Sequence, residues 1–191
     1  MGEATASARR RPRTALLACL PSGAVGAEIG VWKGNFSAIL LEELRPKRLH
    51  LIDPWRYQPS EAYASTWYGG RLAGGQAAMD AMHAAVLRRF HRAISREQVV
   101  VHRATSDEAA DAVADEYFDW VYIDGDHSYE QVRADLNRYS AKLRSGGLLC
   151  GDDYSTAGWW GDGVVRAVEE QAAQWGCATQ VLGRQFLLRK P

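Results

Sequence analysis

Apolar runs and helical patterns alternate along the chain. Short apolar runs typical of buried strands occur at 24–29, 48–52, 99–101, 118–123 and 148–150. Between these runs, apolar residues recur every three or four positions, which predicts helices that pack one face on a sheet. The alternation predicts an α/β fold with a mostly parallel, doubly wound sheet.

The end of the chain departs from this alternation. Residues 178–182 and 185–188 flank the turn Gly183-Arg184, which predicts a terminal antiparallel hairpin. The hairpin brings the predicted sheet to seven strands. Residues 16–191 are therefore expected to form a single domain.

Residues 54–97 interrupt the regular order of strand and helix. Tyrosines and tryptophans lie among paired glycines in the first part, and a helical pattern follows through Met79, Met82, Val86 and Phe90. Aromatic residues among flexible glycines are typical of a mobile cover over a pocket. An insertion whose aromatic residues pack on the core explains the pattern equally well, so both interpretations stay open.

Composition limits the classes of function. With 191 residues and 47% hydrophobic content, the chain is long enough for one domain with a substantial core. Its net charge of +0 and its pI of about 7.0 provide no overall field that would hold nucleic acid or an anionic membrane. The three cysteines lack C-x-x-C spacing, and their odd number indicates reduced thiols in a cytoplasmic protein.

The N-terminal stretch is basic. Residues 9–13 read Arg-Arg-Arg-Pro-Arg and precede a short apolar segment, an arrangement that superficially resembles a signal peptide. The apolar part is at the short limit for such a signal, and a strand follows almost at once. We therefore expect residues 1–15 to form a flexible tail that leads into a short helix packed on the domain. No segment is long enough to span a bilayer.

Acidic residues follow two neighbouring apolar runs at the point where each predicted strand ends. Asp124 and Asp126 follow the run at 118–123, and Asp152 and Asp153 follow the next run. In an open α/β sheet, ligands bind at the edge formed by the carboxyl ends of the strands. Four clustered carboxylates repel one another unless they share protons or a cation, and Mg²⁺ prefers such oxygen ligands. Helix capping and turn formation explain at most two of the four acids.

A glycine-bearing turn follows the first predicted strand, with the spacing Glu28-x-Gly30-x-x-x-Gly34. Glycine lets a backbone approach a ligand closely, and the N-terminus of the following helix favours an anionic group. Asp53 ends the second predicted strand, roughly 20 residues after the turn, where an acid can accept hydrogen bonds from two ribose hydroxyls. The turn and the acid together favour a nucleotide-containing ligand.

Four segments together resemble the class I methyltransferases. They read Ala-Glu-Ile-Gly-Val-Trp-Lys-Gly at 27–34, Ile-Asp-Pro-Trp at 52–55, Ile-Asp-Gly-Asp-His-Ser-Tyr-Glu at 123–130, and Gly-Gly through Gly-Asp-Asp-Tyr at 146–154. From about Leu16 onward, the chain is similar to small bacterial enzymes related to macrocin O-methyltransferase and other antibiotic-tailoring O-methyltransferases. The resemblance implies a Rossmann-like fold.

The resemblance implies S-adenosyl-L-methionine as the cofactor. Glu28, Gly30 and Gly34 would hold its methionine end, and Asp53 would hold its ribose. The residues from Ala104 to Ser106 would border its adenine. The complete set of implied cofactor-binding residues is Glu28, Gly30, Val31, Trp32, Gly34, Asp53, Trp55, Ala104, Thr105, Ser106 and Asp124.

The resemblance also implies a metal site and a general base. Asp124, Asp152 and Asp153 match the positions that bind a divalent cation such as Mg²⁺ in this family. Catechol O-methyltransferase is similar in placing one acid after the fourth strand and two adjacent polar residues after the fifth. Its lysine base corresponds to His127, whereas the sugar methyltransferases indicate Asp126. Both catalytic candidates stay open.

These features predict metal-dependent O-methylation of a small molecule with a hydroxyl group, such as a sugar, a diol or a catechol-like natural product. This acceptor is the expected partner, and a homodimer stays open. One alternative is a metal-independent methyltransferase that acts on nitrogen or another atom. Another is a glycosyltransferase with a D-x-D site at Asp124-Gly125-Asp126, which would leave Asp53 without a role. A third is a non-catalytic domain that binds S-adenosylmethionine.

Overall fold

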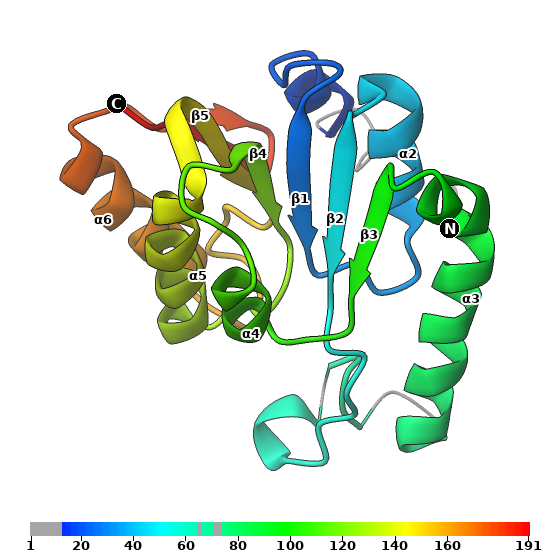
Figure 1. The fold of residues 1–191 in the computed structure, drawn as a ribbon. Coiled ribbons are helices and arrows are strands. Elements are labelled where there is room, and N and C mark those ends of the chain that lie inside the picture. Colours follow the sequence, from blue (N-terminus) through cyan, green and yellow to red (C-terminus); the bar gives the residue numbers. More distant parts are fainter. Residues whose placement is uncertain (1–12, 65, 71–73) are drawn as a thin grey trace.

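The computed structural model describes residues 13–64, 66–70 and 74–191 (Figure 1). The strands are β1 (Val25–Ile29), β2 (Arg48–Ile52), β3 (Val99–His102), β4 (Phe118–Ile123), β5 (Leu143–Gly151), β6 (Gln180–Leu182) and β7 (Gln185–Arg189). The helices are α2 (Asn35–Leu44), the short 3₁₀ helix η1 (Glu61–Tyr63), α3 (Gly75–Ser95), α4 (Ser106–Asp111), α5 (Tyr129–Lys142) and α6 (Gly163–Trp175).

The strands form one seven-stranded sheet in the order β3-β2-β1-β4-β5-β7-β6. β1 to β5 pair in parallel, whereas β7 is antiparallel to both β5 and β6. The predicted doubly wound sheet and terminal hairpin are therefore confirmed. After β3 the chain crosses back to pair β4 with β1, so the strand order reverses between β1 and β4. Ligands bind at this kind of reversal in open α/β sheets.

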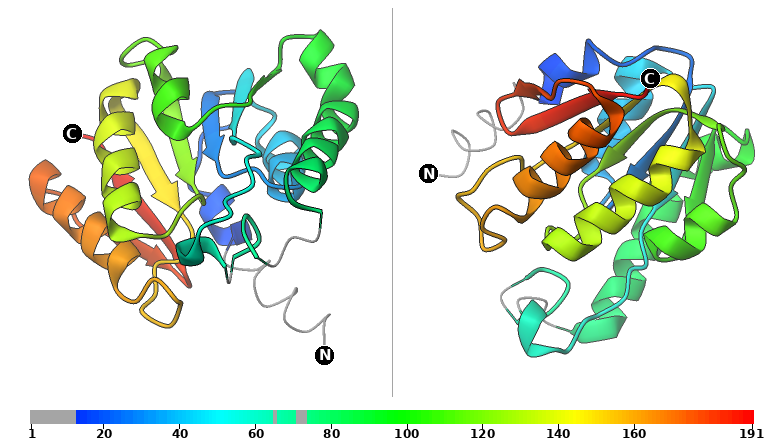
Figure 2. Two further views of the ribbon diagram at one scale, coloured as in Figure 1. Left: turned by 90° about the horizontal axis from the view of Figure 1, so that it is seen from below. Right: turned by 90° about the vertical axis from the view of Figure 1, so that its left-hand side faces the viewer.

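Helices cover both faces of the sheet (Figure 2). One apolar core joins the sheet to α4, α5 and α6, and the other joins it to α2 and α3. Successive side chains on a strand point to opposite faces. In β4, Val121 and Ile123 accordingly enter the first core, while Trp120 and Tyr122 enter the second. Because both faces are buried, the strands are continuous apolar runs.

The structure divides the stretch from residue 54 to residue 97 into two parts. The predicted helix is α3, which connects β2 to β3 and buries Met79, Val86 and Phe90. In its described residues, the part before α3 contains the short helix η1 and no other helix or strand, and it extends beyond the carboxyl edge of the sheet (Figure 1). Its role as a cover stays a prediction.

The chain before β1 packs on the domain. Residues 13–17 are helical, and the side chains of Leu16, Leu17 and Leu20 lie in the core beside α2. Residues 13–15, expected at the end of the tail, therefore belong to this helix. The preceding residues 1–12 lie outside the described residues.

Two further expectations concern composition. Cys19, Cys150 and Cys177 are all free thiols. Within the described ranges, none of the helices combines the length and the apolar character needed to cross a membrane.

Candidate active site

Asp53 ties the loop after β1 to the end of β2. Its carboxylate is 1% exposed and accepts backbone N–H bonds from Val31 (3.0 Å), Trp32 (2.8 Å) and Trp55 (2.7 Å). The hydroxyl of Tyr68, from the segment before α3, donates a fourth hydrogen bond. Burial raises the pKa of Asp53, and these hydrogen bonds oppose the rise. The acid predicted to bind ribose therefore lies among neutral donors, one of which is a side-chain hydroxyl that a ligand hydroxyl can replace.

Glu28, near the end of β1, is a second buried acid at this edge of the sheet. It is 1% exposed, and the hydroxyl of Ser37 in α2 donates a hydrogen bond to it. Burial raises the pKa of Glu28 to about 8, although the bond from Ser37 opposes this effect. A buried acid without a directly bonded cation suits a ligand that carries an ammonium group.

Gly30 is required by the close approach of the turn to the end of β4. Its φ is +90°, and an added Cβ would lie 2.1 Å from the backbone oxygen of Asp124. Only glycine adopts this conformation without a steric penalty. Besides its predicted role beside a cofactor, Gly30 therefore has a structural role, because it lets the turn after β1 pack against the end of β4.

Two tryptophans among the predicted cofactor-binding residues, one after β1 and one after β2, have backbone conformations that are unfavourable for bulky residues. Trp32 has φ 50° and Trp55 has φ 40°. The indole N–H of Trp55, which is fully buried, donates to the carbonyl oxygen of Trp32 at 2.9 Å. Such conformations are uncommon outside glycine and cluster at functional sites. The two strained residues lie on either side of Asp53 in space, because it bonds the amides of both.

The segment from Ala104 to Ser106 follows β3 at the same edge of the sheet. Thr105 forms a capping box with Glu108 at the start of α4. The hydroxyl of Ser106 donates to Asp135 in α5, and burial raises the pKa of Asp135 to about 6. The side chains of Thr105 and Ser106 are therefore engaged in helix packing. Their contact with adenine stays a prediction, in which the backbone and Ala104 would provide the contact surface.

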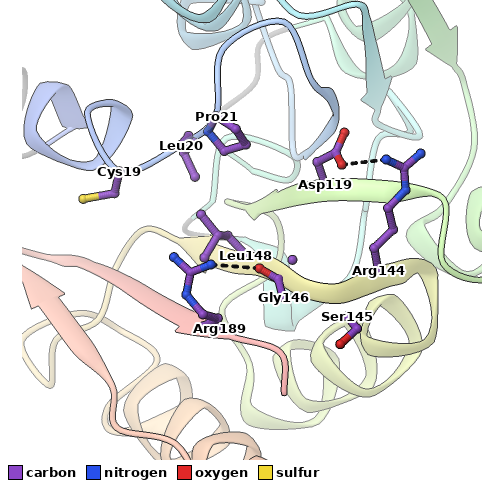
Figure 3. Close-up of a pocket in the computed structure, with 10 residues that line it drawn as sticks. Cys19, Leu20, Pro21, Asp119, Arg144, Ser145, Gly146, Leu148 and Arg189 are labelled. Carbon is purple, nitrogen blue, oxygen red and sulfur yellow. Dashed lines mark hydrogen bonds and ion pairs between the residues drawn. The ribbon is translucent and has the colours of Figure 1, made fainter.

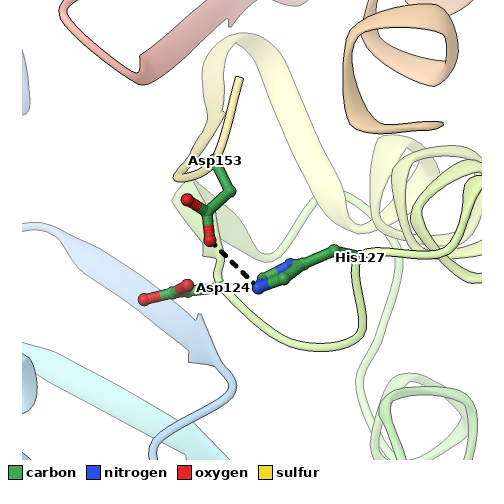
Figure 4. A group of neighbouring side chains, drawn as sticks. All are labelled: Asp124, His127 and Asp153. Atoms are coloured by element: carbon green, nitrogen blue, oxygen red, sulfur yellow. Dashed lines mark ion pairs between the residues drawn. The ribbon is translucent and has the colours of Figure 1, made fainter. Parts of the chain in front are cut away.

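His127 and Asp153 form a pair between the ends of β4 and β5. His127 Nε2 lies 3.1 Å from Asp153 Oδ2, and the two side chains are 18% and 17% exposed. Burial lowers the pKa of His127, but the bond from Asp153 and the charges of neighbouring acids raise it more, so the pKa is raised overall. Figure 4 shows the carboxylate of Asp124 as the third member of this group. One ligand atom of each residue lies within 4.8 Å of the others.

Arginine side chains contact the acids that follow β4 and β5. Arg13 Nη2 donates to Asp124 Oδ2 at 2.7 Å, and Arg13 Nε donates to Asp152 Oδ2 at 3.1 Å. Arg184, in the hairpin turn, pairs with Asp153. Burial raises the pKa of Asp124 to about 7, and Arg13 opposes this effect.

The two adjacent acids after β5 face different partners. Asp152 accepts from Arg13 and from the side-chain amide of Gln185, whereas Asp153 faces His127 and Arg184. The predicted metal ligands Asp124, Asp152 and Asp153 therefore do not fit a three-carboxylate magnesium site, because arginines contact all three. The compact group instead contains His127 in the place of Asp152.

Asp126 binds the segment that precedes α3. Its Oδ2 accepts from the hydroxyl of Tyr63 at the end of η1, and its Oδ1 accepts the backbone N–H of Ser128 at 2.7 Å. The bond to Asp126 is the main factor that raises the pKa of Tyr63 to about 12. Asp126 therefore forms a turn through its bond with Ser128. It also contacts, through Tyr63, the segment that is predicted to cover a pocket.

Tryptophans surround the candidate base. The ring centroids of Trp159 and Trp160, in the loop between β5 and α6, lie 6.3 Å and 4.8 Å from that of His127. Trp159 is 55% exposed, and Trp67, which packs at 5.6 Å on Trp32, is 53% exposed. Tryptophan is enriched at interfaces, because one end of its side chain is apolar and the other donates a hydrogen bond.

Several residues that contact the site acids match no functional motif in the sequence. Arg13, Tyr63, Tyr68, Arg184 and Gln185 all contact the site acids. The abrupt change from a basic run to buried leucines was a usable signal for Arg13. The other four lie in the segment before α3 or in the terminal hairpin, where no functional motif marks them, so only their spatial position identifies them.

A separate cavity of about 300 Å³ lies at the opposite end of the sheet, where β4 and β5 begin (Figure 3). Its wall includes Cys19, Pro21 and an ion pair between Arg144 and Asp119. Asp119 also accepts the backbone N–H of Val25 at the start of β1. These charged groups therefore satisfy one another and hold the ends of the strands.

Comparisons with known proteins agree with this geometry. A family model described as a methyltransferase domain matches residues 27–154. Comparison with curated proteins finds no match. A structure described as a caffeoyl-CoA O-methyltransferase from Staphylococcus aureus is 16% identical and has a TM-score of 0.61, with coverage of 88% of this chain and 76% of that one.

Two further structures are similar. TomG from Streptomyces achromogenes, an O-methyltransferase of tomaymycin synthesis in complex with S-adenosylmethionine, is 16% identical, with a TM-score of 0.60 and coverage of 96% and 80%. The chain spans 42% of a structure described as a sarcosine dimethylglycine methyltransferase from Galdieria sulphuraria, which is 13% identical over 73% of this chain with a TM-score of 0.49. The family match covers the glycine turn, Asp53 and all four acids after β4 and β5. The chain therefore belongs to the methyltransferase-domain family and is an S-adenosylmethionine-dependent methyltransferase.

Proposed function

We propose that this protein methylates a hydroxyl oxygen of a small molecule, such as a sugar, a diol or a catechol-like natural product, with His127 as the general base. The pair between His127 and Asp153 carries the proposal. A carboxylate that accepts the Nε2 hydrogen fixes the imidazole and leaves Nδ1 free to take a proton. Asp126 is the weaker candidate because both of its oxygens already accept hydrogen bonds.

S-adenosylmethionine supplies an electrophilic sulfonium methyl group. Glu28 and Asp53 are proposed to bind its ammonium group and its ribose, which would hold the methyl group near the end of β4. His127 would take the hydroxyl proton while the acceptor oxygen receives the methyl group, and the cofactor sulfur would be left as a neutral thioether. The exposed faces of Trp159 and Trp67 are proposed to bind the apolar surface of the acceptor.

A metal-dependent reaction is the second candidate. It is favoured by the ligand atoms of Asp124, His127 and Asp153, which lie within 4.8 Å of one another. A site with an imidazole ligand suits Mn²⁺, Fe²⁺ or Zn²⁺ better than Mg²⁺. His127 would then be a ligand and Asp126 would remain as the base. Family membership leaves little support for a glycosyltransferase.

The two bases can be separated with the variants His127→Ala and Asp126→Ala. Transfer of radiolabelled methyl groups to a panel of catechols and monosaccharides would be measured with and without EDTA. Loss of the true base is expected to lower kcat by about 10²–10⁴-fold, with partial recovery at high pH where the acceptor ionises unaided. We expect this loss in His127→Ala and a smaller loss in Asp126→Ala.

The exposed histidine His91 in α3 provides the control variant His91→Ala. Its rate should match that of the unmodified protein. A larger loss in Asp126→Ala, together with inactivation by EDTA, would contradict a histidine base and favour the metal-dependent reaction.

A further inference from the structure

The last residue of the basic N-terminal run reaches the acids of the candidate active site. Arg13 lies 111 positions from Asp124 and 139 positions from Asp152 in the sequence, yet its guanidinium group donates to both carboxylates. The two acids come from the ends of adjacent strands, β4 and β5. The side chain of Arg13 therefore joins two carboxylates that follow adjacent strands.

The position of Arg13 is fixed by packing as well as by charge. Its guanidinium carbon lies 4.8 Å from the ring centroid of Phe36 and 6.0 Å from that of Tyr122. A guanidinium over an aromatic face is attracted by the ring electrons. Leu16 and Leu17, in the same short helix, are buried and anchor the backbone. The side chain is only 26% exposed.

Two arginines pair with the three acids after β4 and β5. Arg13 forms ion pairs with Asp124 and Asp152, and Arg184 forms an ion pair with Asp153. The planar guanidinium fork can bond two carboxylates at once in a fixed geometry, which a divalent ion would otherwise have to do. A metal ion that bridged Asp124 Oδ2 and Asp152 Oδ2 would have to displace Arg13.

We propose that Arg13 is a positioning residue that takes the place of a divalent cation between Asp124 and Asp152. This proposal rests on the proposed function, since it concerns the charge balance of the same site. Arg13 holds both carboxylates in place and acts on the reaction through Asp124, which lies beside the pair of His127 and Asp153. Methyl transfer by the unmodified protein is then independent of divalent metal.

Binding of Mn²⁺ tests the proposal without any methyl transfer. Free Mn²⁺ would be measured by electron paramagnetic resonance during titration of the unmodified protein, Arg13→Met and Arg13→Lys, each with bound S-adenosylhomocysteine. Removal of the guanidinium frees two carboxylates, so Arg13→Met should bind Mn²⁺ at least tenfold more tightly than the unmodified protein. Arg13→Lys should be intermediate, because its point charge cannot bridge both acids in the same way.

Arg138→Met is the matched control. Arg138 also pairs with two carboxylates, Asp107 and Asp111, but on the exposed surface of α4 and α5. Its Mn²⁺ affinity should equal that of the unmodified protein. Equal Mn²⁺ affinity in Arg13→Met and the unmodified protein would overturn the proposal, and thermal unfolding of each variant establishes that it is folded.

Activity provides the second measurement. EDTA should leave the rate of the unmodified protein unchanged, and Arg13→Met should lose at least tenfold in kcat. Methylguanidinium or Mn²⁺ in the assay should restore part of that rate, which a purely structural role of Arg13 would not produce. Loss of activity in EDTA with recovery in Mg²⁺ would overturn the proposal. Failure of the proposed function is distinguishable, because it would leave the Mn²⁺ affinities as expected while no hydroxyl acceptor is methylated.

Discussion

The two halves of the carboxyl edge of the sheet hold their acids in different ways. At the ends of β1 and β2, Glu28 and Asp53 are 1% exposed and bonded to hydroxyl and amide donors. At the ends of β4 and β5, Asp124, Asp152 and Asp153 are partly exposed, and arginine side chains contact all three. The first half is buried and pairs acids with neutral groups, whereas the second pairs acids with cations.

The difference shows how one edge of the sheet can have two functions. Buried acids without a bonded cation attract a ligand that brings hydroxyl groups or positive charge, as a cofactor with an ammonium group and a ribose does. Acids held by arginines are fixed in position with most of their charge offset, which suits a site that must orient a base. Asp124 shares features of both halves. It pairs with Arg13, yet burial raises its pKa to about 7.

Glu28→Gln should produce the largest effect, because it removes an ionisable group from the more buried half. Burial raises the pKa of Glu28 from 4.5 to about 8. The proton on Glu28 therefore favours the folded state at pH values below 4.5, and this contribution is lost as the pH rises to about 8. Relative to Glu28→Gln, the free energy of unfolding of the unmodified protein should fall by roughly 3–5 kcal/mol over this interval.

Urea unfolding of both proteins across this pH interval measures the difference. The glutamine oxygen can still accept the hydrogen bond from Ser37, so the comparison isolates the charge. Parallel curves for the two proteins would show that the buried half tolerates a charged Glu28.

Asp152→Ala should separate the two halves by function. The substitution removes one of the two carboxylates that hold Arg13 and also the partner of Gln185. We expect kcat to fall on the order of 10²-fold, as when one preorganised charge is removed from a site. The affinity for S-adenosylhomocysteine, measured by calorimetry, should remain largely unchanged.

Asp111→Ala is the control for this change, because Asp111 pairs with Arg138 on the surface. An equal loss of cofactor affinity and of kcat in Asp152→Ala would indicate that the two halves act as one site.

Asp53→Ala should have the reverse effect. The loss of charge-assisted hydrogen bonds to the ribose should weaken S-adenosylhomocysteine binding by roughly 1–3 kcal/mol. At saturating cofactor, kcat should change much less, because the acids after β4 and β5 are untouched. Calorimetry gives the affinity, and unchanged affinity in a folded variant would remove Asp53 from the cofactor site.

The segment before α3 should respond least. Tyr68 contacts Asp53 in one half, and Tyr63 contacts Asp126 in the other. If the segment covers both, hydrogen exchange of the described amides at 54–64 and 66–70 should slow several-fold when S-adenosylhomocysteine binds. Amides in the middle of α3 serve as the reference. Equal protection with and without the ligand would identify the segment as a fixed packing element.

Most of the fold follows from local patterns. The apolar runs of β1 to β5 and the capping box at Thr105 were readable because each depends on residues close in the chain. The strand ends also placed Asp53 and Asp124 at one edge of the sheet, because parallel strands end on the same side. α3 was harder, since its helical pattern follows an irregular segment without a boundary signal.

The amino-acid sequence by itself determined the order of the elements, the doubly wound sheet and the edge at which the acids gather, because hydrophobic periodicity and strand direction are local properties. Only the tertiary structure decided which partner each acid has. Arg13 belongs to a basic run with no pattern that marks its target, and Asp152 and Asp153 are adjacent in the sequence but face different groups. Arg13 pairs with acids more than 100 positions away. Such pairing depends on how helices and strands pack in three dimensions, and the local sequence pattern does not specify that packing.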